Sequence, residues 1–330
     1  MVISVDGADS TFLDAGSVDR HFSFNNSEDT TFQVIGFTLQ NGKKINENGG
    51  SVYIYNASPK FKNCIFKDNE VTSSSYAGAV YIYNGSPIFN NCTFRDNSSE
   101  SYGGAISIQE DDSAPVFNNC IITSNSASND AGDYRTCHGG GIYVNSGAPT
   151  FNDCQITYNT VSSADYQGEG GGVYIGSFNN LDYDPVTFNR CKIVGNSVSS
   201  AASHARGGGM EIFTRTVLSS CLIADNTATA GGNNNSEGGG LRIYTNSLYN
   251  SNTESYETAE VVIVNCTITG NEAAVSSSSY SGSGGGMYVG FSQDVRMFNT
   301  IIWDNTADYI PNLYSSSGAG LTSDYNDIQD

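Results

Sequence analysis

The feature that most constrains this chain is an internal repeat. Residues 59–69 (PKFKNCIFKDN) return as 87–97 (PIFNNCTFRDN) and, in looser form, as 115–125 (PVFNNCIITSN). Later copies follow, and the asparagines that close successive copies from Asn41 onward lie 28, 28, 28, 34, 37, 30, 45 and 34 residues apart. Because the spacing never falls below 28, one structural unit recurs and insertions lengthen some of its copies.

Each copy holds three short runs of alternating apolar and polar residues, such as 52–55, 60–63 and 65–67. This alternation predicts short β-strands, and no run is long enough for an amphipathic helix. Such a unit buries its apolar face only by stacking on its neighbours. We therefore expect an all-β solenoid of about nine coils with three strands per coil. We expect residues 1–330 to form one domain, excised from a longer chain at both ends.

Composition narrows the function. The chain has 14 Lys and Arg against 34 Asp and Glu, which gives a formal charge of −20. A surface this acidic repels a phosphate backbone, so we expect no nucleic-acid partner. No apolar run approaches the roughly 18 residues of a membrane span, so we expect no transmembrane segment.

Seven of the eight cysteines lie five residues before the closing asparagine of their copy and should share one position in the coil. They are Cys64, Cys92, Cys120, Cys154, Cys191, Cys221 and Cys266. We expect a stacked, reduced column, because parallel Cβ directions suit a disulfide badly and a line of thiols offers no tetrahedral metal site. Cys137 stands apart beside His138, as a loop thiol or, alternatively, a nucleophile or ligand.

The closing asparagines should stack in the same way, with side-chain amides bonding along the column and to the backbone at a turn. They are Asn69, Asn97, Asn125, Asn159, Asn196, Asn226, Asn271 and Asn305. We expect this ladder, like the cysteine column, to be structural.

A glycine pair or triplet followed by an apolar alternation, as at 49–55, 139–144 and 284–289, alternates with the pattern Phe-x-Asn-Cys. This combination resembles the right-handed parallel β-helix repeat of bacterial surface and secreted proteins in the pectin-lyase-like superfamily. It is similar to the GGA(I/L/V) and FxxN repeats of chlamydial polymorphic outer membrane proteins. The resemblance implies an extracellular or cell-surface location.

In the strand after the glycines, the second residue should point outward, and tyrosine recurs there. The tyrosines of this strand that we expect to contact a ligand are Tyr53, Tyr81, Tyr143, Tyr174, Tyr244 and Tyr288. Exposed phenol rings can stack on sugars or enter a protein interface. The alternative is that these rings pack on one another along the sheet.

Insertions should flank this strand. Those at 126–138, 160–169, 197–206, 227–237 and 272–283 precede it, and those at 176–186 and 245–260 follow it. They are rich in Ser, Asn, Gly and Tyr, a composition typical of adaptable recognition loops. The alternative is flexible, solvated loops.

The superfamily includes polysaccharide lyases and hydrolases, so an enzyme is the competing interpretation. Glu211 and Arg242 should be neighbours in one outward column with Tyr174, and His204 precedes Glu211 closely. These four are the candidate catalytic residues, for a general base beside a charge-neutralising cation. The alternative is that Glu211 and Arg242 form a cross-strand ion pair, worth less than about 1 kcal/mol.

We therefore expect an adhesive or glycan-binding module whose partner is a polysaccharide or a host or cell-surface glycan. A polysaccharide lyase or hydrolase is the first alternative, and a structural spacer or filament subunit that associates end to end is the second. We expect no cofactor and no metal, although the acidic loops offer a weak case for Ca²⁺.

Overall fold

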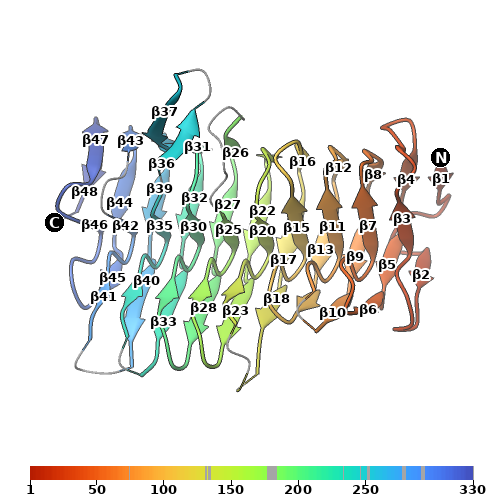
Figure 1. Cartoon of the computed structure of the whole chain (residues 1–330), viewed down its shortest axis with the longest axis horizontal. Helices are drawn as coiled ribbons and strands as arrows, with labels where there is room; N and C mark the ends of the chain where they lie inside the picture. Colours follow the sequence, from red (N-terminus) through yellow and green to blue (C-terminus); the bar gives the residue numbers. More distant parts are fainter. Residues whose placement is uncertain are drawn as a thin grey trace.

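In the computed structural model, short parallel strands stack into long sheets and wind into a rod with the termini at opposite ends (Figure 1). It describes the whole chain except residues 74, 131, 133, 134, 177–183, 233, 246, 251, 252, 277–279, 291–293 and 330, and only the backbone of 247–250. The described residues contain no helix, and therefore none long and apolar enough to cross a membrane.

Two sheets hold eleven strands each. Sheet A consists of β1 (Val2–Ile3), β4 (Gln33–Ile35), β8 (Lys60–Lys62), β12 (Ile88–Asn90), β16 (Val116–Asn118), β21 (Thr150–Asn152), β26 (Val186–Asn189), β31 (Thr216–Ser219), β38 (Glu260–Val264), β43 (Asp294–Phe298) and β47 (Gly320–Asp324). Sheet B consists of β2 (Phe12–Asp14), β5 (Thr38–Gln40), β9 (Ile65–Lys67), β13 (Thr93–Arg95), β17 (Ile121–Thr123), β22 (Gln155–Thr157), β27 (Lys192–Val194), β32 (Leu222–Ala224), β39 (Thr267–Thr269), β44 (Ile301–Trp303) and β48 (Asp327–Ile328).

Sheet C is formed by the strands that follow the glycines. They are β3 (Phe22–Phe24), β7 (Val52–Tyr55), β11 (Val80–Tyr83), β15 (Ile106–Gln109), β20 (Ile142–Val144), β25 (Val173–Ile175), β30 (Met210–Ile212), β35 (Leu241–Ile243), β42 (Met287–Val289) and β46 (Leu313–Ser315). A separate antiparallel hairpin joins β36 (Ser247–Asn250) to β37 (Ser255–Thr258).

Two further sheets lie between B and C along the chain. Sheet D consists of β6 (Lys43–Ile45), β10 (Glu70–Thr72), β14 (Ser98–Ser99), β18 (Ser126–Ser128), β23 (Thr160–Ser163), β28 (Ser197–Ser200), β33 (Thr227–Ala230), β40 (Glu272–Val275) and β45 (Thr306–Ala307). Sheet E is short and consists of β19 (Cys137–His138), β24 (Gly168–Glu169), β29 (Ala205–Arg206), β34 (Ser236–Glu237) and β41 (Gly282–Ser283).

The parallel β-helix expected from the repeat is present, but its coils differ from the prediction. One coil passes through sheets A, B, D and C, as in β8, β9, β10 and β11, so it has four strands rather than three. Sheets A and B each hold eleven strands, so the count of about nine coils is also low. The missed strands follow the closing asparagine, where a single small apolar residue between polar ones gives almost no alternation signal.

The same difference corrects the interpretation of the insertions. Those at 126–138, 160–169, 197–206, 227–237 and 272–283 begin with a strand of sheet D and end with a strand of sheet E. They bury a second apolar cluster, which includes Ala127, Val161, Val198 and Cys137. Cys137 is therefore a fully buried strand residue rather than a loop thiol. Of the later insertions, residues 177–183 lie outside the described part.

The main core consists of columns of identical residues. Phe61, Phe89, Phe117, Phe151 and Phe188 of sheet A are fully buried, and neighbouring rings stack with centroids 4.7–5.1 Å apart. All eight cysteines are buried and free of disulfides. Each of the seven in the column lies just after a strand of sheet A, where Sγ contacts backbone carbonyls, as Cys154 does those of Phe117 and Asn152.

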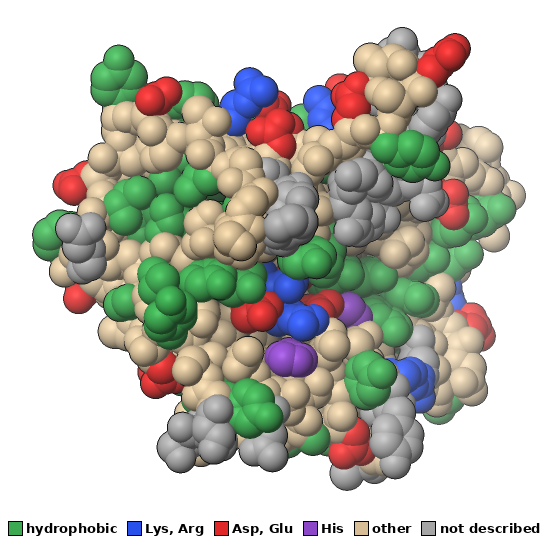
Figure 2. All heavy atoms as spheres, turned by 60° about the vertical axis from the view of Figure 1, so that its left-hand side comes forward, with side chains coloured by type: hydrophobic (Ala, Val, Ile, Leu, Met, Phe, Trp, Pro, Cys, Tyr) green, Lys and Arg blue, Asp and Glu red, His purple; other side chains and the backbone are tan. Residues whose placement is uncertain are grey.

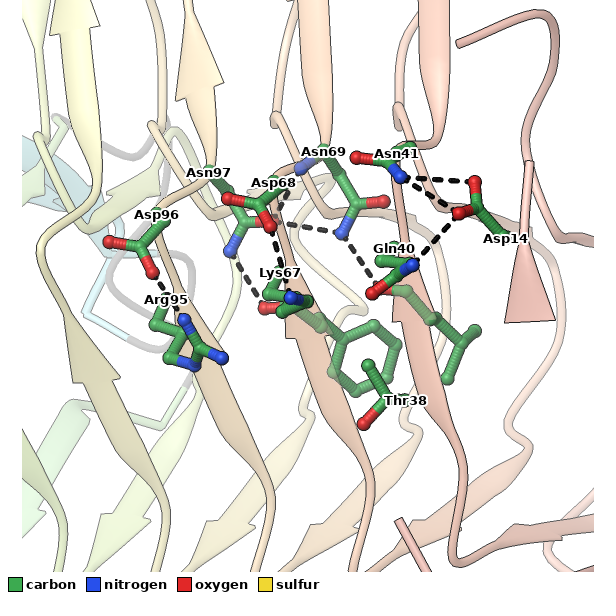
Figure 3. Close-up of polar contacts among 12 residues, drawn as sticks. Asp14, Thr38, Gln40, Asn41, Lys67, Asp68, Asn69, Arg95, Asp96 and Asn97 are labelled. Carbon is green, nitrogen blue, oxygen red and sulfur yellow. Dashed lines mark hydrogen bonds and ion pairs between the residues drawn. The ribbon is translucent and has the colours of Figure 1, made fainter. Parts of the chain in front are cut away.

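The closing asparagines form a continuous amide ladder where sheet B meets sheet D. The Asn69 backbone N–H and side-chain Nδ2 donate to Oδ1 of Asn97, at 3.1 and 2.9 Å (Figure 3). Asn97 donates in the same way to Oδ1 of Asn125. The ladder continues to Asn305 and Asn312. Each bend thus satisfies buried backbone groups that would otherwise lack partners.

Candidate functional site

The site begins with the glycines that join sheet E to sheet C. Gly139 has φ of 65°, in the left-handed region that favours glycine. A Cβ atom on Gly140 would lie only 2.3 Å from the carbonyl oxygen of Gly171 in the next coil. The glycine repeat is therefore required for a tight corner whose neighbouring coils touch through backbone atoms.

This corner is concave. Side chains that point outward from sheet E contact side chains that point outward from sheet C, which is possible only if the two sheets face each other across the corner. The ring centroids of His138 and Tyr174 lie 4.3 Å apart, and Arg242 Nε lies 2.6 Å from Glu237 Oε2. Single β-bridges continue the sheet E side through Tyr102 and Tyr76.

We call the line of side chains along this corner the seam. Its sheet E side consists of Tyr76, Tyr102, His138, Glu169, Arg206 and Glu237, and its sheet C side of Tyr53, Tyr81, Ser107, Tyr143, Tyr174, Glu211, Arg242 and Tyr288. Charged side chains and histidine gather near the middle of the face in Figure 2, with hydrophobic side chains to either side.

Tyrosines dominate the first half of the seam, and they pack on one another. The rings of Tyr53 and Tyr81 are stacked at 5.5 Å, and those of Tyr143 and Tyr174 at 5.3 Å. Tyr76 lies against Tyr81, at 6.2 Å, and Tyr143, at 5.8 Å. Their mutual contact covers the ring faces that lie along the seam.

This packing changes the expectation for two of the predicted ligand-binding tyrosines. Tyr81 and Tyr143 are 6% and 8% exposed, so they line the floor of the seam and offer no free ring face. Tyr53, Tyr174 and Tyr288 are partly exposed. Tyr244, at 39% exposure, lies two residues beyond Arg242 along sheet C and stacks under its guanidinium.

Alternating charges fill the centre of the seam. The Glu169 carboxylate meets His138 Nδ1 at 3.2 Å and Arg206 Nη1 at 3.0 Å. Glu237 Oε2 in turn meets Nε of Arg206 at 3.4 Å and Nε of Arg242 at 2.6 Å. The network runs across both sheets, and Arg206 and Arg242 each lie between two carboxyl groups.

Within this network, two buried carboxyl groups take opposite protonation states. Burial opposes ionisation of Glu169, but the His138 hydrogen bond and the charges of His138 and Arg206 hold its pKa at about 2. Burial raises the pKa of Glu211 to about 8, more than the Arg242 charge lowers it. At neutral pH, Glu169 is thus ionised and Glu211 is mostly protonated.

Glu211 is the most enclosed member of the network. It is fully buried, and its Oε1 pairs with Arg242 Nη1. Its Oε2 has no hydrogen-bond partner among the described residues. Arg242 is 5% exposed and covered by Tyr244, 4.9 Å from its Cζ, and Tyr288, at 5.7 Å.

The seam opens toward the N-terminus into a pocket of about 640 Å³. Its walls include Arg20, whose Cζ lies 5.1 Å from the Tyr53 ring centre, and Lys44. Arg20 pairs with Glu47 at 2.5 Å, and Lys44 pairs with Glu47 at 3.0 Å and Asp19 at 3.1 Å. The pocket therefore continues the pattern of tyrosine beside paired charges.

The structure brings together three of the four candidate catalytic residues. Tyr174 pairs in register with Glu211, and Glu211 with Arg242, on adjacent strands. His204 lies at the rim of sheet E, where its Nδ1 is 3.2 Å from the Asn235 carbonyl oxygen. Glu211 and Arg242 do pair across neighbouring strands, but the pair is buried, so it is not the exposed cross-strand ion pair that the sequence offered as an alternative.

Our sequence reasoning did not assign His138, Glu169, Arg206 and Glu237 to the site as a set. A signal was present, because each directly precedes a glycine of the corner. It was missed because the residues before the glycines were assigned to loops. Among the described residues, no group of three or more His, Cys, Asp or Glu is arranged to hold a metal ion.

Comparison with known proteins supports the fold assignment. Residues 20–198, just over half of the chain, match the family model described as the right handed beta helix region. No curated protein and no solved structure matches the chain. The family match and the stacked parallel sheets agree, and the chain belongs to the family of right-handed beta helix regions.

Proposed function

We propose that this protein is an extracellular or cell-surface module that binds a glycan along the seam, for adhesion or for polysaccharide recognition. The observation that carries the proposal is the concave corner itself, where tyrosine hydroxyl groups and paired charges follow the rod axis from the pocket beside Tyr53 to Tyr288. Each coil advances by roughly 4.8 Å, about the length of one sugar ring in an extended chain.

The chemistry of the seam suits sugars. A row of hydroxyl groups and ring edges offers hydrogen bonds and apolar contact together, which sugar rings need. The partners are already ordered by packing, because the tyrosines stack on one another and the charges are paired. Binding to such a surface costs little side-chain entropy.

The test is retention on immobilised or gel-embedded polysaccharides, measured together with release of soluble sugars. The variant Tyr53→Ala removes a partly exposed ring of the seam and should weaken retention. Tyr256→Ala removes a ring that is 75% exposed on the projecting hairpin and should not. Binding in the seam would be contradicted if both variants lost retention equally, or if neither variant lost it.

One observation favours a polysaccharide lyase or hydrolase as a second candidate. Glu211 keeps its proton near neutral pH beside Arg242, as a general acid would. Against this, Glu211 is fully buried beneath its neighbours and does not reach the surface of the seam. New reducing ends or unsaturated uronates that disappear in Glu211→Gln would favour the enzyme over the binding module.

A structural spacer would give a third pattern. If no polysaccharide retains the protein and concentrated samples form fibres, end-to-end association of coils replaces glycan binding as the function. Sheet A ends in β1 and β47, each paired on one side only, and such strands are able to pair with another chain.

A further inference from the structure

We infer that the seam binds an uncharged glycan and excludes polymers of uronic acids. This inference rests on the proposed function and specifies its ligand class. The observation behind it is that each Arg and Lys side chain described in the seam and its pocket is already paired with an acidic side chain.

A uronate polymer needs cations that are available to its carboxylates. Arg206 is held by Glu169 and Glu237, and its Nη1 also donates to Gln167 Oε1 at 2.7 Å. Arg242 is held by Glu211 and Glu237 and is nearly buried. An incoming carboxylate would have to displace partners that are already desolvated, and would leave buried acids without a countercharge.

In the N-terminal pocket, which is more exposed to solvent, the cations are also paired with carboxylates. Arg20 is occupied by Glu47, and Lys44 by Glu47 and Asp19. The side chains of Glu47 and Asp19 are 57% and 66% exposed, against 11% for Arg20 and 17% for Lys44, so the most exposed charged groups of the pocket are carboxylates. They repel a polyanion at the entrance, and the chain's net charge of −20 adds to this repulsion.

The remaining polar groups of the seam are uncharged donors and acceptors. Burial raises the pKa of Tyr53 above its usual value and that of Tyr288 to about 12, so both phenols keep their protons. A neutral hydroxyl group donates to and accepts from sugar hydroxyls equally well. The surface thus matches a ligand made of hydroxyl groups.

The experiment is affinity electrophoresis of the intact chain in native gels. The neutral probes are barley β-glucan, galactomannan and hydroxyethyl cellulose, and the acidic probes are alginate and polygalacturonate. Each is run at about 0.01 M and about 0.1 M salt, between which the Debye length falls from about 30 to about 10 Å. We expect at least one neutral polymer to retard the protein equally at both salt concentrations, and the acidic polymers not to.

A matched pair of variants locates the binding. Tyr288→Phe removes one hydroxyl group from the seam, whereas Tyr158→Phe removes one from a ring that is 63% exposed and follows β22 of sheet B. Loss of one hydrogen bond should weaken retardation by neutral polymer about two- to tenfold in Tyr288→Phe only. Equal retardation of the wild type and Tyr288→Phe would overturn the inference.

The failures are distinguishable. Retardation by alginate or polygalacturonate that weakens as salt rises would overturn the neutral-ligand inference and leave glycan binding intact. Absence of retardation by all of these polymers would overturn both, because the inference depends on binding.

Discussion

The variant Glu211→Gln should become more stable than the wild-type protein as the pH rises from 4.5 to 8. Burial raises the pKa of this carboxyl from its usual 4.5 to about 8. In the unfolded chain it ionises from about pH 4.5 upward, but in the folded chain it stays protonated until about pH 8. Between these values the unfolded state binds fewer protons, so rising pH favours unfolding.

The magnitude follows from the shift. The difference between 8 and 4.5 is 3.5 pH units, and each unit corresponds to about 1.36 kcal/mol. The stability that depends on a protonated Glu211 is therefore complete below pH 4.5, and on the order of 5 kcal/mol is lost by pH 8. Glutamine keeps the hydrogen-bonding capacity toward Arg242 and cannot ionise, so Glu211→Gln should not show this loss.

Urea unfolding followed by far-ultraviolet circular dichroism, at several pH values from 4.5 to 8, measures the difference in free energy of unfolding between variant and wild type. We expect that difference to grow in favour of the variant by on the order of 5 kcal/mol across the range. Other groups, including Glu169 with its lowered pKa, titrate in both proteins and cancel in the difference.

Tyr174→Phe is the matched control, because it removes a polar group from the same column of sheet C without removing a carboxyl group. Burial raises the pKa of Tyr174 above its usual value, so the effect of this variant should not vary between pH 4.5 and 8. A difference between Glu211→Gln and wild type that stays constant with pH would refute the claim that burial keeps Glu211 protonated.

Three further predictions concern the coil. Asn159→Ala should lower the free energy of unfolding, measured by urea titration, by about 3–5 kcal/mol, because Asn159 forms hydrogen bonds with Asn125, Asn196 and the Ile122 carbonyl. A loss below about 1 kcal/mol would contradict a stabilising ladder. Gly140→Ala should lower the free energy of unfolding by about 1–3 kcal/mol, because the new Cβ atom would lie 2.3 Å from the Gly171 carbonyl oxygen. If the variant is as stable as the wild type in the same titration, the corner can relax to accept a side chain. Ellman's reagent should find no reactive thiol in the native protein and all eight after denaturation, and rapid native reaction would disprove their burial.

The sequence predicted the elements that repeat with the coil. The positions of Phe89, Cys92 and Asn97 recur at a fixed distance, and a solenoid stacks residues that occupy equivalent positions. The repeat therefore sufficed to predict the parallel β-helix, and it also placed Glu211 beside Arg242. These are consequences of register, which the spacing of the copies determines.

The sequence by itself determined the coil and its columns, whereas the tertiary structure alone decided the angle between sheets E and C. The repeat predicts which side chains point outward, but it does not predict whether the outer surfaces of sheets E and C face each other. Because the corner is concave, Glu237 reaches Arg242 across two sheets, and Glu211 becomes fully buried although it points away from the core. The seam exists because sheets E and C meet at a concave corner. Charged side chains in this corner are buried where the dielectric constant is low, so they are paired.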